Sequence, residues 1–543
     1  MTIPDKDPFR ATLDKCYPAW SLGSASEAPV TRSTPCAETH SGVLDPLTLR
    51  TIEVDLLFDS VNSASTRAGQ SVLYASLTNP PASLDVAKQR QRAILEIESN
   101  PELRKAIEAM IASASHHEND FYDLLYGVFL GLFGSRAHPQ EFEGFGYDQF
   151  IKGTAFMLNL VHGADSAGVP ESPYLRFLID SIRELKSSRA YDMARGPAYR
   201  TEKGMLSASE KSWWVPAVRF RPTLIKPTWL IAGFALLIAA LEFVPLLLDL
   251  VSSITPVFWL FLMPLALLYI PLVGNFDRDG CIYPLREIFK TSSEMRRALY
   301  SLGQLDELMT LIRFKESFGH PMVMPELIQS KQHTIKLKGV RNPILAKDKP
   351  DYVANGIDLG KERLALITGP NSGGKTAFCK TLAQVQVLAQ IGSYVPAESA
   401  KASVADRIFY QIPETSQLQD GEGRFGTELR RTRDIFMVAS PQSLVIMDEL
   451  SEGTTHQEKV DISLSILDGF YRKGNTTLLI THNHELVDCC LEKNMGMARQ
   501  VEFKGEHPTY RIIPGVSRIS HADRVARKIG FGKDDIDRLL QGN

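Results

Sequence analysis

The stretch ALITGPNSGGKT, residues 365–376, decides the fold of the C-terminal part of this chain. It contains a complete G-x-x-x-x-G-K-[ST] phosphate loop, and the apolar run ALIT predicts the strand that precedes such a loop. Glycines let backbone N–H groups surround phosphate oxygens, Lys375 places a charge on the outer phosphates, and the Thr376 hydroxyl can ligate Mg²⁺. The residues that follow predict a helix, whose N-terminus adds partial positive charge. The predicted nucleotide-binding residues are Gly369, Pro370, Asn371, Ser372, Gly373, Gly374, Lys375, Thr376 and Ala377.

Two further apolar runs predict the rest of the nucleotide site. The run SLVIMDE, residues 443–449, ends in two carboxylates about seventy residues after the loop. Asp448 is suited to hold Mg²⁺ through water, and Glu449 to orient or deprotonate the attacking water. A third run, TTLLI at 476–480, is followed by Thr481 and His482, whose imidazole could sense the γ-phosphate. We therefore predict catalytic roles for Glu449, His482 and Lys375, and metal-binding roles for Thr376 and Asp448.

These residues carry a resemblance to the MutS mismatch-repair family. The string ITGPNSGGKTAFCKTLAQVQVLAQIGSYVPAE, residues 367–398, resembles that family's ATPase core, and DELSEGTT and THNHEL resemble its DE-x-x-x-GT and TH-x-x-EL elements. RNPIL at Arg341 and YVAN at Tyr352 are similar to its RHP element and to the aromatic residue that stacks on adenine. The resemblance therefore implies ATP and Mg²⁺ as cofactors, with Tyr352 as the adenine platform.

The resemblance also implies a domain organisation. Residues 44–53, 66–77, 86–103 and 302–317 resemble the family's helical core and lever. We expect an α/β P-loop ATPase domain of the ABC type at the C-terminus, preceded by an all-α core and lever domain that a two-helix transmembrane hairpin interrupts. The predicted segments are a disordered polar N-terminus (1–40), the core and lever (41–226), the hairpin (227–274), returning lever helices (275–328) and the ATPase domain (329–543).

Two apolar stretches carry the prediction of a membrane hairpin. Residues 228–248 contain one ionisable side chain, Glu242, and residues 254–273 contain none, so each is close to the ~20 residues that cross a bilayer. Lysines and arginines flank the pair but are absent from the short linker, which predicts both soluble ends in the cytoplasm and a lipid-bilayer partner at residues 228–273 of a cytoplasmic membrane protein. The alternative is a buried hairpin in the core of a helical domain.

The resemblance further implies a homodimer that completes composite ATP sites, and DNA as a partner through the core and lever. In the signature stretch GEGRFGTEL, residues 421–429, Phe425 and Glu428 follow the family pattern, whereas Gly423 replaces the usual serine and removes its hydroxyl. Only about forty residues precede the core, so we expect a shortened form without the mismatch-reading and connector domains. The formal net charge of −3 gives no independent sign of nucleic-acid binding.

The predicted function is that of an ATP-hydrolysing, membrane-anchored protein that resembles MutS and binds DNA. One alternative is an ATP-dependent tether or scaffold with slow turnover and no role on DNA. A second is a transporter ATPase of the wider ABC superfamily, which two predicted spans and the absence of an LSGGQ-type string disfavour. The six cysteines lack zinc-binding spacing and form no evident disulfide framework.

Overall fold

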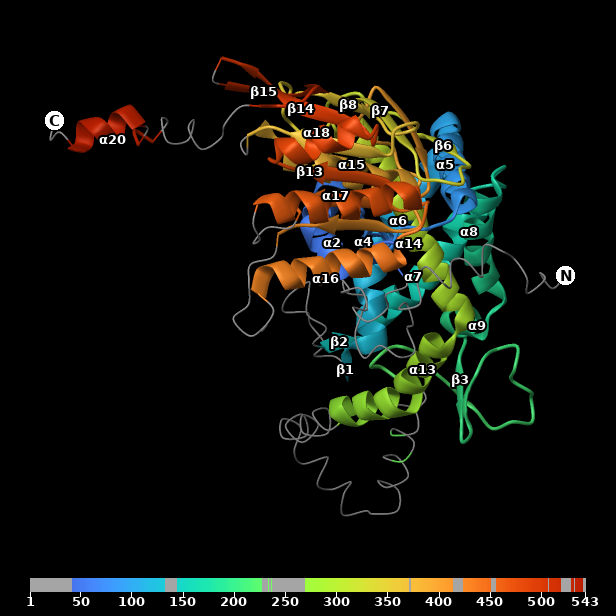
Figure 1. The fold of residues 1–543 in the computed structure, drawn as a ribbon. Coiled ribbons are helices and arrows are strands. Elements are labelled where there is room, and N and C mark those ends of the chain that lie inside the picture. The colour runs from blue at the N-terminus through green and yellow to red at the C-terminus, as the bar shows by residue number, and fades with distance from the viewer. Residues whose placement is uncertain are drawn as a thin grey trace.

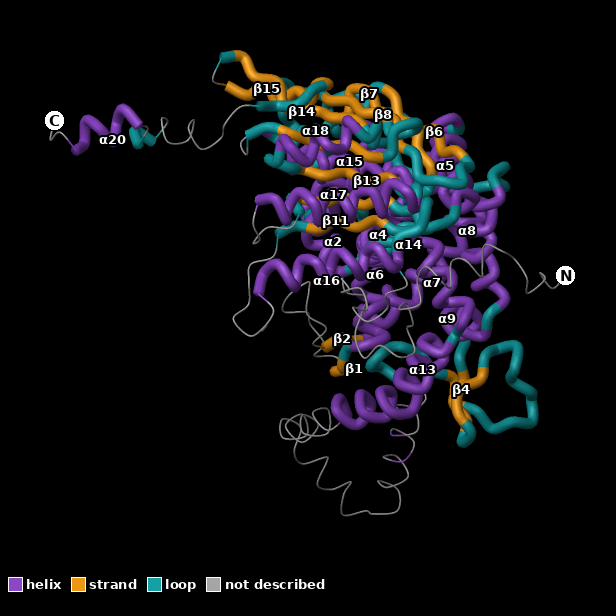
Figure 2. Tube along the Cα trace, in the orientation of Figure 1, coloured by secondary structure: helices purple, strands orange, loops and turns teal. Residues whose placement is uncertain are grey.

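A computed structural model describes most of the chain (Figure 1). The described residues are 42–131, 144–226, 269–370, 373–413, 423–450, 456–505, 507–518, 529–531 and 533–540, together with residues 233 and 236. Figure 2 shows the longer strands, β7 to β15, gathered in one part of the molecule and mainly helices in the rest.

The N-terminal half begins with helices whose starts are set by capping side chains. Asp45, Thr66, Ser83 and Asn100 each accept a hydrogen bond from a backbone N–H in the first turn, which satisfies donors that have no partner within the helix. These helices are α2 (Pro46–Thr51), α3 (Val54–Val61), α4 (Arg67–Thr78), α5 (Leu84–Ser99) and α6 (Pro101–Tyr126). The second group is α7 (Tyr147–Ser166), α8 (Pro173–Glu184), the 3₁₀ turn Leu185–Ser187 and α9 (Arg189–Arg195).

Short strands interrupt this helical region, so the prediction of an all-α domain needs correction. β1 (Val128–Gly131) and β2 (Gly144–Gly146) pair in parallel, and β3 (Tyr199–Thr201) lies antiparallel between β4 (Gly204–Leu206) and β5 (Val218–Arg219). Two to four residues per strand give too little period-two alternation for a sequence pattern to reveal them.

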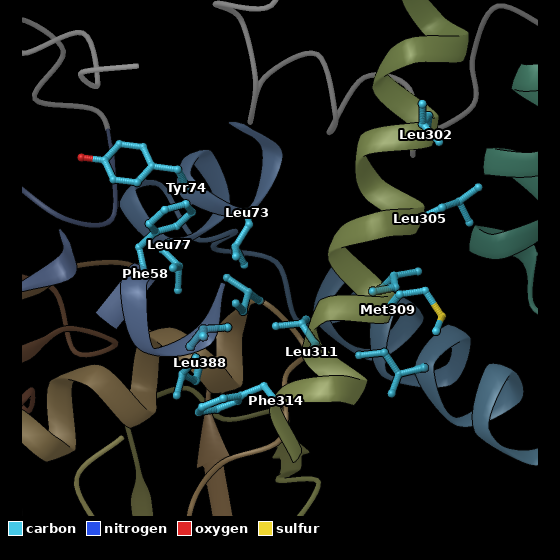
Figure 3. Packing of buried hydrophobic residues seen from close by; sticks show 14 of the residues in the cluster. Phe58, Leu73, Tyr74, Leu77, Leu302, Leu305, Met309, Leu311, Phe314 and Leu388 are labelled. Atoms are coloured by element: carbon cyan, nitrogen blue, oxygen red, sulfur yellow. The ribbon is translucent and has the colours of Figure 1, made fainter. Parts of the chain in front are cut away.

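Helix α14 (Ser293–Ser317) is the central element of the helical region. It follows a helical run at residues 269–277, the π-helix Arg278–Ile282 and α13 (Tyr283–Thr291). Its side chains are buried on nearly all sides, which distinguishes it from an amphipathic surface helix. Figure 3 shows Leu305, Met309 and Phe314 of α14 in one cluster with side chains of α3 and α4 and with Leu388 of α15. One continuous core therefore joins the helical region to the nucleotide-binding part.

The C-terminal half contains a six-stranded sheet in the order β11-β12-β13-β9-β14-β15. All neighbouring strands are parallel except β15, which pairs antiparallel with β14. The strands are β9 (Leu364–Thr368), β11 (Ile408–Gln411), β12 (Leu444–Asp448), β13 (Thr476–Ile480), β14 (Met497–Lys504) and β15 (His507–Pro514). The helices are α15 (Lys375–Gln390), α16 (Gly423–Val438), α17 (His456–Lys473), α18 (His484–Glu492) and α20 (Lys533–Leu540).

Both faces of this sheet are covered, which explains why its central strands are apolar throughout. Val445, Met447 and Leu479 belong to a cluster with α16, α17 and α18, whereas Ile446 and Ile480 belong to the main core together with α15. A smaller sheet in the order β6-β10-β7-β8 adjoins it, formed by β6 (Glu326–Ile328), β7 (Ile335–Val340), β8 (Asn355–Asp358) and β10 (Ser399–Ser403). The domain boundary at residue 329 stays a prediction.

The prediction of a transmembrane hairpin is wrong. Over the part of the chain that the structure describes, no helix combines the length and the apolar character needed to cross a membrane. Most of residues 228–273 lies outside the described residues, but Val273 is 1% exposed and lines a cavity with Phe220 and Cys281 of the protein itself. Apolar runs of this length also occur in protein cores, so hydropathy alone did not separate the two cases. The cytoplasmic-membrane location rested on the hairpin and is wrong with it, and the lipid-bilayer partner is not supported.

Candidate nucleotide site

The phosphate loop follows β9, which lies between β13 and β14 in the sheet. Gly369 and Gly374 have φ angles of +132° and +84°, which side chains rarely adopt. A Cβ at Gly373 would lie 2.8 Å from Cγ2 of Val501 on β14. The glycines are therefore needed for both the turn and its approach to β14. Asn371 and Ser372 lie outside the described residues, and Pro370 is buried.

Lys375 is the first residue of α15 and is only 3% exposed. Its Nζ donates to the carbonyl oxygens of Gly369 at 2.6 Å and Pro370 at 2.9 Å. Burial lowers the pKa of Lys375 to about 8, against the opposing effect of Asp448 and Glu449. The ammonium group is thus held inside the loop, at the position where the outer phosphates of a nucleotide would be bound.

Thr376 and Asp448 come together although they are far apart in sequence. The Thr376 hydroxyl donates to Oδ2 of Asp448 at 2.9 Å. Asp448 ends β12 opposite Ile480 of β13, and Thr376 occupies the first turn of α15 with Ala377. Because β12, β13 and β9 are parallel, their carboxyl ends meet at one edge of the sheet, where ligands of such sheets bind.

Glu449 and His482 lie at the same edge. Glu449 has a left-handed φ of 66°, and its backbone N–H donates to Ile480 O at 2.9 Å. Its Oε1 accepts from the backbone N–H of His482 at 3.2 Å and lies 3.7 Å from His482 Nε2. His482 Nε2 is in turn 3.5 Å from Lys375 Nζ. The structure therefore brings the three predicted catalytic side chains into one cluster.

Among the described residues, Tyr352 forms no hydrogen bond or ring contact with the side chains of this cluster. It is half-buried against the main core, and burial raises its pKa despite hydrogen bonding to the Asn342 backbone and the Thr381 side chain. Thr381 lies about one and a half turns beyond Thr376 in α15. The adenine-stacking role of Tyr352 stays a prediction.

Two residues near the site escaped the sequence analysis. Lys459 of α17 places Nζ 3.5 Å from Oε2 of Glu449. Tyr510 of β15 is 53% exposed, and its Cδ1 lies 3.4 Å from where a Cβ of Gly374 would be. Neither belongs to a motif, because Lys459 reaches Glu449 only through the packing of α17, and Tyr510 reaches Gly374 only through the β14–β15 hairpin.

The signature stretch lies only partly within the described residues. Gly423 is the first residue of α16, and residues 421 and 422 are outside the described part. Glu428 is 4% exposed, and its backbone carbonyl accepts from Gln411 of β11. Arg431 forms an ion pair with Asp45, the cap of α2, which joins α16 to the helical region.

A family of known proteins matches the C-terminal part of this chain. Residues 365–539 match the family described as MutS domain V. This region is similar to MutS domain V. The similarity supports the resemblance to the MutS family that the motifs predicted.

Several curated proteins are similar to this chain. Endonuclease MutS2 of Ligilactobacillus salivarius is 32% identical over 252 residues, which are 46% of this chain and 31% of the relative. DNA mismatch repair protein msh3 of Aspergillus fumigatus is 35% identical over 45% of this chain and 22% of the relative. DNA mismatch repair protein MutS of Haloquadratum walsbyi is 28% identical over 45% and 27%. The chain thus spans less than a third of the relatives it matches, and these matches do not support the expectation of a shortened form.

Proposed function

We propose that this protein binds ATP with Mg²⁺ at the carboxyl edge of the six-stranded sheet and hydrolyses it. The observation that carries the proposal is the convergence of four predicted residues there. Lys375 is buried inside the loop, Thr376 bonds to Asp448 at 2.9 Å, and His482 Nε2 lies 3.5 Å from Lys375 Nζ. Such a cluster supplies positive charge, oxygen ligands and an imidazole at the place where a phosphate loop directs phosphates.

The residues fit both cofactors. A nucleotide phosphate needs accessible backbone N–H groups, which glycines provide. Glycine at 373 also lets the loop lie against Val501, where a Cβ would come within 2.8 Å. Mg²⁺ is bound by few protein oxygens and completes its shell with water and phosphate. Thr376 and Asp448 supply two such oxygens, and among the described residues no group of three or more His, Cys, Asp or Glu side chains forms a metal-binding cluster.

The chemistry assigned to the side chains follows from their positions. Lys375 would compensate charge on the outer phosphates, while Thr376 and Asp448 would hold Mg²⁺, which supplies further positive charge to the phosphates when bound. Glu449 would orient or deprotonate the attacking water, after leaving the His482 backbone N–H that it contacts at 3.2 Å. His482 would sense the terminal phosphate from the neighbouring strand end.

We further propose that the protein acts as a homodimer and engages DNA. Both parts rest on the resemblance to MutS, and the names of two relatives, which include DNA mismatch repair, support the second. In the dimer the α16 region of one subunit would complete the ATP site of the other. Gly423 can offer a backbone N–H but no hydroxyl there, which predicts slow activation across the interface.

A slow-turnover scaffold is the second candidate. The Glu449 carboxylate supports it, because one oxygen accepts from the His482 N–H at 3.2 Å and the other lies 3.5 Å from Lys459 Nζ. A base held by two partners must be released before it can activate water, which would keep turnover low while ATP stays bound.

The experiment is steady-state ATP hydrolysis by the purified full chain, with and without duplex DNA, at several salt concentrations. Stimulation by DNA that disappears at high salt is the expected result, because binding to the phosphate backbone weakens as salt rises. Hydrolysis that DNA does not change would contradict the DNA role but keep the ATPase. Tight ATP binding without measurable hydrolysis would instead favour the scaffold.

A further inference from the structure

Two adjacent tryptophans are exposed in the loop that joins β4 to β5. Trp213 is 89% exposed and Trp214 is 68% exposed, and their ring centroids lie 5.8 Å apart with the planes at 77°. Tryptophan carries a large apolar area and is enriched at interfaces, so an exposed pair indicates a surface that meets a partner. Figure 1 shows the neighbouring β3 beside α13 and far from β14 and β15. The loop therefore takes no part in the nucleotide site.

The sheet beside this loop carries an aromatic ring and two cations on one face. The strand register places Tyr199 of β3 opposite Leu206 of β4 and Arg219 of β5, so these three side chains share a face. Lys211 of the loop belongs to the same face, because its Nζ lies 4.2 Å from the centre of the Tyr199 ring. One cation thus covers the ring and another stands next to it.

The opposite face of the sheet is used for packing within the protein. Arg200 and Met205 are paired there, and Met205 is only 3% exposed. The Arg200 guanidinium lies 4.5 Å from the centre of the Phe276 ring and also against Gly280, where any added Cβ would collide with it. The face that carries the exposed Arg219 is therefore the one that a partner can reach.

This part of the chain is basic. Residues 195–226 hold seven lysines and arginines but two acidic residues, in a chain whose net charge is −3. One of the two acidic residues, Glu210, pairs with Arg189 from outside the segment. Within the described residues, neither Lys211 nor Arg219 forms an ion pair with a carboxylate. The surface therefore has positive charge that is complementary to a polyanion.

We infer that this aromatic and basic surface, formed by Trp213, Trp214, Tyr199, Lys211 and Arg219, binds a single strand of DNA. The bases of a single strand stack on exposed aromatic side chains, and nearby cations bind the phosphates between them. Here the cations are interleaved with the rings, whereas an element that lies on a lipid surface separates apolar and basic side chains onto different faces. The inference rests on the DNA part of the proposed function, to which it adds the surface and the form of DNA.

The test is the binding of a fluorescent oligothymidylate to the full chain, followed by anisotropy at several salt concentrations. We expect saturable binding that weakens as salt rises. Trp213→Ala and Trp214→Ala should each weaken the affinity at least about fivefold, because each removes a stacking ring. Trp213→Phe keeps a ring and should recover most of that loss. Val169→Ala is the control, because it removes another exposed apolar side chain, at 75% exposure, and should have no effect.

The inference is overturned if the oligothymidylate does not bind, or if both alanine variants bind it as tightly as the unmodified chain does. Loss of binding to anionic lipid vesicles in the same variants, with oligothymidylate binding unchanged, would also overturn it.

Stimulation of ATP hydrolysis by duplex DNA, measured on the same proteins, tests the proposed function separately. If duplex DNA stimulates hydrolysis but the oligothymidylate does not bind, only the single-strand surface is contradicted. If oligothymidylate binding depends on the two tryptophans but duplex DNA has no effect, the surface is supported and the duplex role is contradicted.

Discussion

Two corners of the molecule place a basic side chain beside glycine, and they differ in the charges around it. At the phosphate loop, the carboxylates Asp448 and Glu449 favour the charged form of Lys375. At the far end, Arg200 lies against Gly280 and Phe276 without a carboxylate partner among the described residues. The first corner is a network of opposite charges around the phosphate loop. The second holds its arginine by packing against an aromatic ring and a glycine, so the two regions should respond to different substitutions.

The largest expected effect is on ATP binding, which should depend on Lys375 but not on Arg200. Lys375→Ala should abolish ATP binding, because it removes the charge that meets the outer phosphates, whereas Arg200→Gln should leave ATP affinity unchanged. Equilibrium binding of a fluorescent ATP analogue measures both. Lys401→Ala is the matched control, since that exposed lysine pairs with Glu326 in the smaller, four-stranded sheet. Undiminished ATP binding by Lys375→Ala would contradict the assignment of the ATP site to the phosphate loop.

Next in size is the effect of Glu449→Gln on turnover. An amide cannot accept the proton of the attacking water, so the hydrolysis rate should fall by about 10²–10⁴-fold while ATP binding is retained. Single-turnover hydrolysis and ATP binding, measured on the same preparation, give the two values. A rate that stays within a factor of two would show that Glu449 is not the base and that turnover in the unmodified protein has another origin.

A third cation, Arg90, can be compared with Lys375 and Arg200, because it is buried and forms an ion pair with a buried carboxylate. Arg90 of α5 contacts Glu307 of α14 at 2.6 Å, and both side chains are at most 2% exposed. Arg90→Met would leave the Glu307 carboxylate buried alone and should lower the free energy of unfolding by about 3–5 kcal/mol. The double variant Arg90→Met/Glu307→Leu should recover most of that loss. Urea unfolding measures both, and an equal loss in single and double variants would argue against the pair.

The smallest expected effect is a pH dependence of ATP binding. Burial lowers the pKa of Lys375 in the folded protein to about 8, so the lysine is charged below this pH and loses its proton above it. ATP affinity should therefore be constant below pH 8 and fall by up to about tenfold per pH unit above it. Lys375→Arg is the control, because a guanidinium does not deprotonate in this range and any remaining affinity should not change with pH.

The same lysine makes stability rise with pH. In the unfolded chain its pKa is near 10.5, so between pH 8 and 10.5 the unfolded state binds more protons than the folded state. The cost of burying the charge is present in full below pH 8 and is relieved as pH rises through that value. Lys375→Met should remove this contribution, and identical pH profiles for the two proteins would contradict the burial of the charge.

Sequence patterns were most informative where chemistry restricts residue choice. The glycines, Lys375, Asp448 and Glu449 were predicted from what phosphate and metal binding require, and in the structure Lys375 bonds to the loop carbonyls and Thr376 to Asp448. Their roles stay predictions. Residues that act through packing left no such signal, as Lys459 and Tyr510 show. The apolar residues 228–273 led to a wrong prediction, because the length of an apolar run alone does not distinguish a membrane span from a segment of a protein core. Residue Val273 is covered by protein.

The central claim is that the region similar to MutS domain V holds one ATP site, and equilibrium binding of ATP to the unmodified full chain tests it most directly. The titration is run with Mg²⁺ and again with a chelator in its place. Saturable binding of one ATP per chain, weaker without Mg²⁺, is the predicted result. The absence of saturable binding in both conditions would contradict the claim.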